Sequence, residues 1–180
     1  MIYTIVSTGM RSCEIRALQW DQFINNGEAI LINAMVDSNN ERVDHLKKWT
    51  NDNKKWRVTV LPDRTARMLQ TLKLLQDDDS NKYVFRWKDE EITTYHLLDH
   101  FKVILAKNGI EHAKDKRNIT IHSLRFTYNT LMRREVSDDD LRLMMGHTKE
   151  QMTDYYDKSK VIDNLPGLLI NKDSINGIFN

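Results

Sequence analysis

A histidine and an arginine at helical spacing are two residues of this sequence that could do chemistry. His122 and Arg125 stand three residues apart in "IHSLRFTYNTLMRRE", a stretch with the apolar pattern of a helix. Residues at that spacing project from the same face of a helix. A histidine beside an arginine is costly to bury without an anionic partner, so the pair would suit a phosphate or a carboxylate. An exposed polar face with an incidental histidine would show the same spacing.

Arg11 and His147 are further candidates for contact with an anion. Arg11 follows a Thr-Gly turn in "TGMRSCE" at a predicted helix start, where backbone N–H groups favour a negative charge. A surface arginine beside a tight turn would have the same sequence. His147 follows Gly146 and, taken alone, is typical of a capping or core histidine. None of these residues, taken alone, indicates a particular function.

Two adjacent tyrosines, Tyr155 and Tyr156, close the stretch "GHTKEQMTDYY". A tyrosine hydroxyl can form a covalent intermediate, but its pKa near 10 keeps it mostly protonated at neutral pH. To act as a nucleophile it therefore needs a neighbour that takes or shares its proton. Adjacent residues on a helix point about 100° apart, so the two tyrosines cannot share one site.

Taken together, these stretches resemble the catalytic domain of the tyrosine recombinases, the family of phage and conjugative-element integrases and Xer-type enzymes. The first box is "TGMRSCEIRALQWDQF", the second "HSLRFTYNTLM" and the third "LRLMMGHTKEQMTDYY". They match the family's Thr-Gly-Leu-Arg, His-x-x-Arg, and Leu-Gly-His followed by Thr-x-x-Tyr. Each box alone is a weak match, but all three occur in the family's order and spacing. The resemblance runs from about Thr4 to Lys158.

The resemblance identifies Tyr156 as the nucleophile. In the family this tyrosine follows the third-box histidine by nine residues and closes Thr-x-x-Tyr, which from His147 and Thr153 leads to Tyr156. Tyr155 would then pack or form a hydrogen bond nearby. The implied product is a 3′-phosphotyrosyl link with a free 5′-hydroxyl. This link keeps the phosphodiester energy, so no cofactor and no metal are implied.

The resemblance also assigns roles to the other box residues. Arg11 and Arg125 would clamp the non-bridging phosphate oxygens with fixed, bidentate donors. His147 would form a hydrogen bond with the scissile phosphate, and His122 would assist proton transfer. Glu14, at the family's acidic position, would orient Arg11 rather than react.

The family's general-acid lysine is harder to place, because the match in the hairpin is poor. In the family this lysine precedes by five or six residues an arginine that begins a strand. Here Arg57 begins "RVTVLP", and Asp52 and Asn51 stand at those positions. A longer hairpin would place Lys48 on the first strand, and Lys48 is our prediction, with Lys54, Lys55 and Lys47 as alternatives. We expect the DNA backbone to be contacted by Lys47, Lys54, Lys55 and Arg57.

Composition favours a helix-rich globular protein. The chain has 180 residues, of which 40% are hydrophobic and 29% charged, with two prolines and six glycines. No apolar run is long enough to span a membrane and no signal segment is visible, so we expect a cytoplasmic protein. The single Cys13 excludes an internal disulfide and a cysteine-built zinc site. The net charge of +1 neither supports nor excludes a nucleic-acid partner.

Local patterns predict the elements that would position these residues. A helix should end at Thr8-Gly9 and another should follow it. We expect strands within 29–36, 41–49 and 55–61, with a hairpin turn at the Asn-Asp-Asn cluster of residues 51–53. Further helices are predicted at 63–76, 93–109, 121–135, 138–145 and 149–158.

The predicted fold is α+β and mainly α, a tyrosine-recombinase catalytic domain with a small antiparallel β-hairpin sheet packed on a helical core. Residues 1–160 would form this domain. The family's separate N-terminal DNA-binding domain has no counterpart, and the abrupt apolar start suggests that upstream residues are absent. Residues 161–180 are predicted to be an extended arm ending in a weak helix. Its apolar residues would dock on a neighbouring subunit or pack on their own domain.

The expected function is that of a site-specific recombinase or integrase, for integration or excision of a phage or mobile element. Its partner would be double-stranded DNA, on which it would form a homotetramer, with no small-molecule substrate and no membrane. One alternative is a catalytically silent DNA-binding relative of the same fold. Another is a type IB topoisomerase-like enzyme. A third is a metal-dependent nuclease using Asp77–Asp79 or Asp138–Asp140. Against the nuclease, the side chains of consecutive acidic residues diverge and do not converge on one ion.

Overall fold

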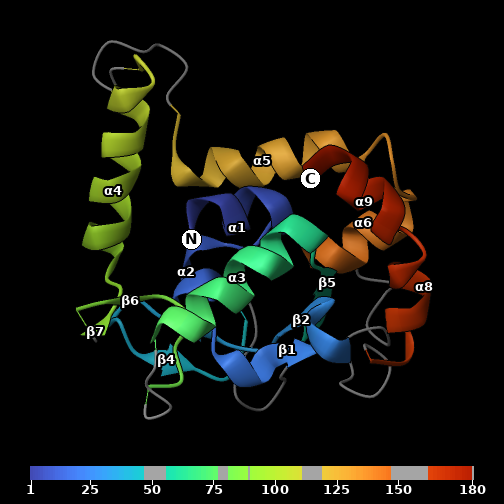
Figure 1. Cartoon of the computed structure of the whole chain (residues 1–180), viewed down its shortest axis with the longest axis horizontal. Coiled ribbons are helices and arrows are strands. Elements are labelled where there is room, and N and C mark those ends of the chain that lie inside the picture. The colour runs from blue at the N-terminus through green and yellow to red at the C-terminus, as the bar shows by residue number, and fades with distance from the viewer. Residues whose placement is uncertain (47–55, 77–80, 89, 111–118, 147–161, 180) are drawn as a thin grey trace.

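The computed structural model describes residues 1–46, 56–76, 81–88, 90–110, 119–146 and 162–179. Within them, helices surround the short helix at the N-terminus, and small antiparallel sheets lie together on one side of the chain (Figure 1). The predicted α+β, mainly helical fold with a small antiparallel sheet is confirmed.

The helices largely match those predicted from apolar spacing. In the described residues they are α1 (Ile2–Thr8), α2 (Ser12–Arg16), α3 (Asp63–Gln76), α4 (Thr94–Lys107), α5 (Ile121–Met132), α6 (Asp138–Met145), α8 (Leu165–Leu169) and α9 (Lys172–Phe179). Single 3-10 turns, η1 (Trp20–Gln22) and η2 (Asn25–Gly27), lie between them. The helix predicted over 149–158 lies outside the described residues.

Helix ends follow the local signals in the sequence. Gly9, Gly109 and Gly146 follow the ends of α1, α4 and α6 with φ of 63°, 73° and 63°, the left-handed conformation that a glycine adopts without strain. Ser137 caps α6, because its hydroxyl accepts a hydrogen bond from the backbone N–H of Asp140 at 3.1 Å.

The central sheet brings together segments far apart in the sequence. Its strands are β1 (Phe23–Ile24), β2 (Ala29–Ile32) and β5 (Arg57–Val60), all antiparallel in the order β1-β2-β5. The register pairs Ile32 with Arg57. β3 (Met35–Val36) pairs with β4 (Arg42–Val43), and β6 (Arg86–Trp87) with β7 (Glu90–Glu91). The sequence predicted a hairpin between 41–49 and 55–61, but among the described residues β5 pairs with β2 and β4 with β3. The turn predicted at 51–53 lies outside the described residues.

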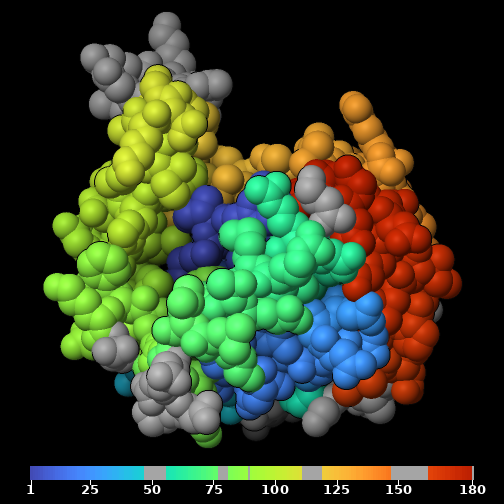
Figure 2. Space-filling model, viewed as in Figure 1, coloured from blue at the N-terminus to red at the C-terminus, as the bar shows by residue number. Residues whose placement is uncertain are grey.

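Two apolar cores meet at α5. The first lies between α1, α2, α3, α4 and α5 and includes Ile5, Ile15, Leu69, Phe101 and Ile121. The second lies between β2, β5, α5, α6, α8 and α9 and includes Val58, Tyr128, Met144, Leu168 and Phe179. α3 crosses one face of the molecule, with α4 to one side and α8 and α9 to the other (Figure 2). The buried face of α5 and the buried strand β5 therefore hold Arg125 and Arg57 in fixed positions between the two cores.

The arm predicted over residues 161–180 ends in a helix, α9, as expected, but its first part is not extended, because it forms α8. Leu165, Leu168, Ile175 and Phe179 are buried in the core of their own domain. Phe179 stacks on Tyr128 with ring centroids 6.0 Å apart. These four residues pack on the same chain, and docking of the tail on a neighbouring subunit stays a prediction.

Polar contacts hold α9 in the same place. The side-chain amide of Asn176 donates to Asp63 at 3.0 Å and its carbonyl oxygen accepts from the Asp63 backbone at 2.8 Å. Lys172 forms ion pairs with Glu28 and Asp63. In the described part of the chain, no helix is long and apolar enough to cross a membrane.

Candidate active site

The turn between α1 and α2 positions Arg11 and Glu14. Gly9 lies so close to α5 that an added Cβ would come within 2.5 Å of Tyr128 Cδ1, so only glycine fits here. Arg11 then precedes α2, and its backbone N–H and Nη1 donate to the two carboxylate oxygens of Glu14 at 2.7 and 2.8 Å. The contact expected between Glu14 and Arg11 is therefore present. The Arg11 side chain is 25% exposed, whereas that of Glu14 is fully buried.

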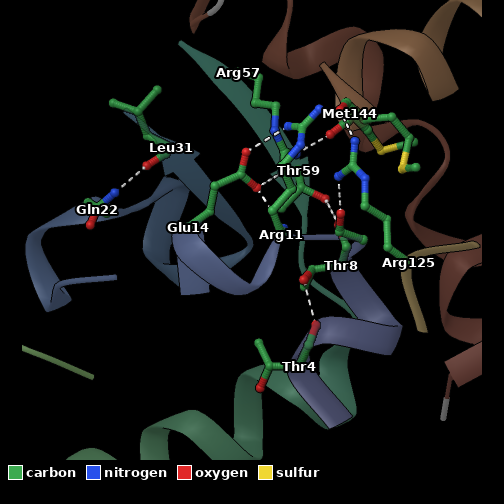
Figure 3. Close-up of polar contacts among 12 residues, drawn as sticks. Thr4, Thr8, Arg11, Glu14, Gln22, Leu31, Arg57, Thr59, Arg125 and Met144 are labelled. Carbon is green, nitrogen blue, oxygen red and sulfur yellow. Dashed lines mark hydrogen bonds and ion pairs between the residues drawn. The ribbon is translucent and has the colours of Figure 1, made fainter. Parts of the chain in front are cut away.

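Arg57, at the start of β5, joins the same carboxylate from the other side. Its Nη2 lies 2.6 Å from Glu14 Oε2, and its Nη1 donates to the backbone carbonyl of Met144 near the end of α6 (Figure 3). The residue is 2% exposed. One guanidinium group thus connects β5, α2 and α6.

Arg125 approaches the cluster from α5. It is 3% exposed and donates hydrogen bonds to the carbonyl oxygens of Gly9 and Met145 (Figure 3). Gly9 lies two residues before Arg11, and Met145 is the last residue of α6. The side chains of Arg11, Arg57 and Arg125, together with Glu14, therefore gather where the first and second boxes meet the end of α6.

Among the residues that the structure describes, this cluster carries more positive than negative charge. Burial alone would raise the pKa of Glu14, but Arg57, Arg11 and the Arg11 backbone N–H outweigh it and lower that pKa to about 2. Burial, and then repulsion from Arg57 and Arg11, lowers the pKa of Arg125 to about 9. At neutral pH the described residues thus place three cationic guanidinium groups around one carboxylate. Such an excess of positive charge favours the binding of an anion.

His122 lies one helical turn before Arg125, on the exposed side of α5. Its ring meets that of Phe126 edge to face, with centroids 4.8 Å apart. The structure places His122 beside the cluster on the same helix, but at the surface, whereas Arg125 is buried.

A family model described as the phage integrase family matches residues 1–161. The chain belongs to the phage integrase family. Several solved structures share its fold. One is the integrase of the Tn1549 transposon in complex with transposon right end DNA, with a TM-score of 0.64 and 16% identity over 94% of this chain and 56% of that one. A comparison with curated proteins found no match.

Xer recombinases are similar to this integrase-family chain as well. XerA recombinase has a TM-score of 0.59 and 18% identity, over 91% of this chain and 54% of that chain. XerH, solved with palindromic difH substrate after cleavage, has a TM-score of 0.58 and 20% identity, over 91% and 43%. The chain thus spans about half the length of these relatives. The resemblance to tyrosine recombinases is confirmed.

The sequence-predicted site residues of this integrase-family chain fall into two groups. Arg11, Glu14 and Arg125 lie together in the buried cluster, with His122 beside them. The residues that lie outside the described part of the chain are Lys47, Lys48, Lys54, Lys55, His147, Tyr155 and Tyr156.

Arg57 requires a correction. We expected it to contact the DNA backbone, but its side chain is buried against Glu14 and Met144 and does not face solvent. Sequence reasoning missed this role because the contact depends on the pairing of β2 with β5. A charged residue at the start of the strand "RVTVL", which has apolar residues at three of its other four positions, was the one signal that could have suggested a buried ion pair.

The acidic stretches considered for a metal-dependent nuclease make other contacts where they are described. Asp139 pairs with Arg142 at 3.3 Å, and Asp140 accepts a hydrogen bond from the Asn171 side chain at 3.0 Å. In the described ranges, no group of three or more His, Cys, Asp or Glu residues could hold a metal ion.

Gly146 is expected to be intolerant of a side chain, because the stem of Arg57 lies against it. A Cβ added there would meet Arg57 Cδ at 2.6 Å, and φ is 63°. We expect Gly146→Ala to lower the free energy of unfolding by about 2–4 kcal/mol, from backbone strain and steric overlap together. Urea denaturation followed by circular dichroism would measure the loss.

Gly109→Ala is the matched control. Gly109 also has a positive φ, of 73°, but nothing lies within 4 Å of an added Cβ. Only the backbone strain, roughly 1–2 kcal/mol, is then expected. Equal losses at the two positions would contradict a tight contact between Arg57 and Gly146.

Proposed function

We propose that this integrase-family chain carries the catalytic site of a site-specific DNA recombinase. It cleaves and rejoins DNA strands through a covalent 3′-phosphotyrosyl intermediate, in the integration or excision of a phage or mobile element. The observation that carries the proposal is the buried cluster of Arg11, Arg57 and Arg125 around Glu14. The excess positive charge of its described residues suits a phosphodiester, and Arg11, Glu14 and Arg125 belong to the boxes that match this family.

Electrostatic stabilisation would be the main contribution of the described residues. In the proposed site Arg11 and Arg125 hold the non-bridging oxygens of the scissile phosphate, which gain charge as the hydroxyl attacks. Because these guanidinium groups are fixed by hydrogen bonds before DNA binds, little reorganisation is needed at the moment of reaction. The quarter-exposed side chain of Arg11 gives the phosphate access to the cluster.

Proton transfer and nucleophilic attack are assigned to residues of the second and third boxes and to Lys48. Tyr156 would attack the phosphorus and form the phosphotyrosyl bond as the 5′-oxygen leaves. His122 would assist transfer of the tyrosine proton, His147 would form a hydrogen bond with the phosphate, and Lys48 would protonate the leaving oxygen. The phosphodiester energy stays in the protein–DNA bond, so rejoining needs the 5′-hydroxyl and no further energy source.

Double-stranded DNA is the proposed partner, bound by a homotetramer of the full-length protein in the cytoplasm. The similar structures of Tn1549 integrase and XerH were solved with transposon right end DNA and difH substrate, which supports this substrate class. Lys47, Lys54 and Lys55 would contact the DNA backbone. Such contacts make binding strongly dependent on salt.

Covalent trapping tests the proposal. The full-length protein would be incubated with a nicked duplex carrying the end of its own element, labelled on the fragment that stays attached, in EDTA. Loss of the short downstream fragment prevents religation, so a protein–DNA band that survives denaturant and disappears with protease is expected. Cleavage that needs Mg²⁺ and leaves no covalent band would favour a metal-dependent nuclease. DNA binding without any cleavage would favour the catalytically silent relative.

A further inference from the structure

We propose that Arg57 is a positioning residue of this site, one that fixes the turn carrying Arg11 relative to the end of α6. The inference rests on the proposed function. It replaces the DNA contact expected for Arg57 with a role inside the protein.

The first support is an unbroken chain of contacts across the site. Arg11 Nη1 lies 2.8 Å from Glu14 Oε1, and Arg57 Nη2 lies 2.6 Å from Glu14 Oε2. The other terminal nitrogen of Arg57 donates to the Met144 carbonyl. Glu14 thus has one oxygen for each arginine side chain, and Arg57 has one terminal nitrogen for each neighbouring helix. A shift of α6 relative to α2 would have to break one of these bonds.

The second support is the aliphatic part of the same side chain. Arg57 Cδ lies 2.6 Å and Nε lies 3.3 Å from where a Cβ of Gly146 would be. The stem therefore packs on the backbone at the point where the chain leaves α6. The next residue in the sequence is His147, the proposed phosphate contact. Arg57 thus makes two contacts in the site. It touches the backbone of Gly146, just before His147, and it binds the carboxylate of Glu14, which orients Arg11.

The third support is that Arg57 itself is fixed. It stands in β5, opposite Ile32 of β2, and all residues of β5 are buried. Arg57 therefore links the sheet to α2 through Glu14 and to the end of α6 through Met144. A lysine at this position would have one nitrogen and could not reach two partners in different directions, whereas the planar guanidinium does.

A simple structural ion pair is the competing explanation, and Arg16 provides a matched control. Arg16 is also buried, at 6% exposure, and makes three hydrogen bonds of 2.7 Å, to Ile92, Thr94 and Asn40. None of these partners belongs to the cluster. Arg57→Lys and Arg16→Lys should therefore both weaken the fold, but only Arg57→Lys should disturb the site.

The experiment compares three quantities for the full-length protein on the nicked duplex. They are the urea midpoint, the dissociation constant for the duplex, and the single-turnover rate of adduct formation with saturating DNA at a temperature where each variant is folded. We expect Arg57→Lys to slow adduct formation roughly 10- to 100-fold, as small misplacements of reacting groups do. Its dissociation constant should stay within about 3-fold, because the positively charged surface is unchanged. Arg16→Lys should keep the rate within about 3-fold.

The double variant Arg57→Met/Glu14→Gln covers the case in which a single variant does not fold. Replacing Arg57 and Glu14 together leaves neither of the two as a buried charge without its partner, so the double variant should be more stable than Glu14→Gln alone. The rate should stay low, because neither side chain then ties α6 to α2. Recovery of the rate together with stability would overturn the positioning role, and so would an unchanged rate in folded Arg57→Lys. If the parent protein and Arg16→Lys form no adduct, the proposed function fails, and the positioning role fails with it.

Discussion

Replacing Tyr156 by phenylalanine is expected to abolish the covalent protein–DNA band. The substitution removes the hydroxyl that forms the bond to phosphorus and leaves the ring in place. Loss of a nucleophile typically reduces catalysis by several orders of magnitude, so we expect a decrease of roughly 10³-fold or more in the rate of adduct formation. DNA affinity should change little, because the cationic residues remain. The nicked duplex in EDTA, with a denaturing gel, measures the effect.

Tyr155→Phe is the matched control, because it removes the same atom from the neighbouring residue. Adjacent side chains on a helix point in directions about 100° apart, so only one of these hydroxyl groups can face the phosphate. Tyr155→Phe should therefore form the adduct at close to the parent rate. If instead Tyr155→Phe loses the adduct and Tyr156→Phe keeps it, the alignment of the third box is displaced by one residue.

Local signals predicted those parts of the fold that depend on a few neighbouring residues. Apolar spacing predicted α3, and Gly9 and Gly109 marked helix ends, where glycine readily adopts the positive φ that ends a helix. Ser137 predicted the start of α6 through its side-chain cap. Each of these signals lies within one or two turns of the element it determines.

What could not be predicted depends on contacts between distant segments. Arg57 is 43 positions from Glu14 and 87 from Met144, and no local pattern specifies those distances. The strand pairing was missed for the same reason, since the partner of β5 lies in β2 rather than in the nearest strand-like segment. The tail was predicted as an arm because Pro166 and Gly167 interrupt its apolar pattern, whereas Pro166 in fact lies in the first turn of α8, where proline is tolerated.

Glu14→Gln is expected to give the largest loss of stability in the described part of the chain. The side chain is fully buried and is the counter-charge for Arg11 and Arg57, so its removal leaves buried cations without compensation. Removing one partner of a buried ion pair lowers the free energy of unfolding by about 3–5 kcal/mol. Denaturant unfolding at pH 7, followed by circular dichroism, would measure this loss. Glu28→Gln removes a partly exposed partner of Lys172 and should cost less than about 1 kcal/mol.

The pH dependence of that loss distinguishes the contribution of the Glu14 charge to stability from the contribution of its side-chain packing. The pKa of Glu14 lies at about 2 in the folded protein, below its ordinary value of 4.5. A carboxyl group with a lowered pKa contributes stability that is fully present above the unfolded pKa and is lost as the pH falls towards the folded one. The difference between parent and Glu14→Gln should therefore be constant above about pH 5 and shrink between pH 4.5 and 2, by roughly 3 kcal/mol. A difference that stays the same down to pH 2.5 would mean that the glutamine disturbs packing, and that the carboxylate charge does not hold the three arginines together.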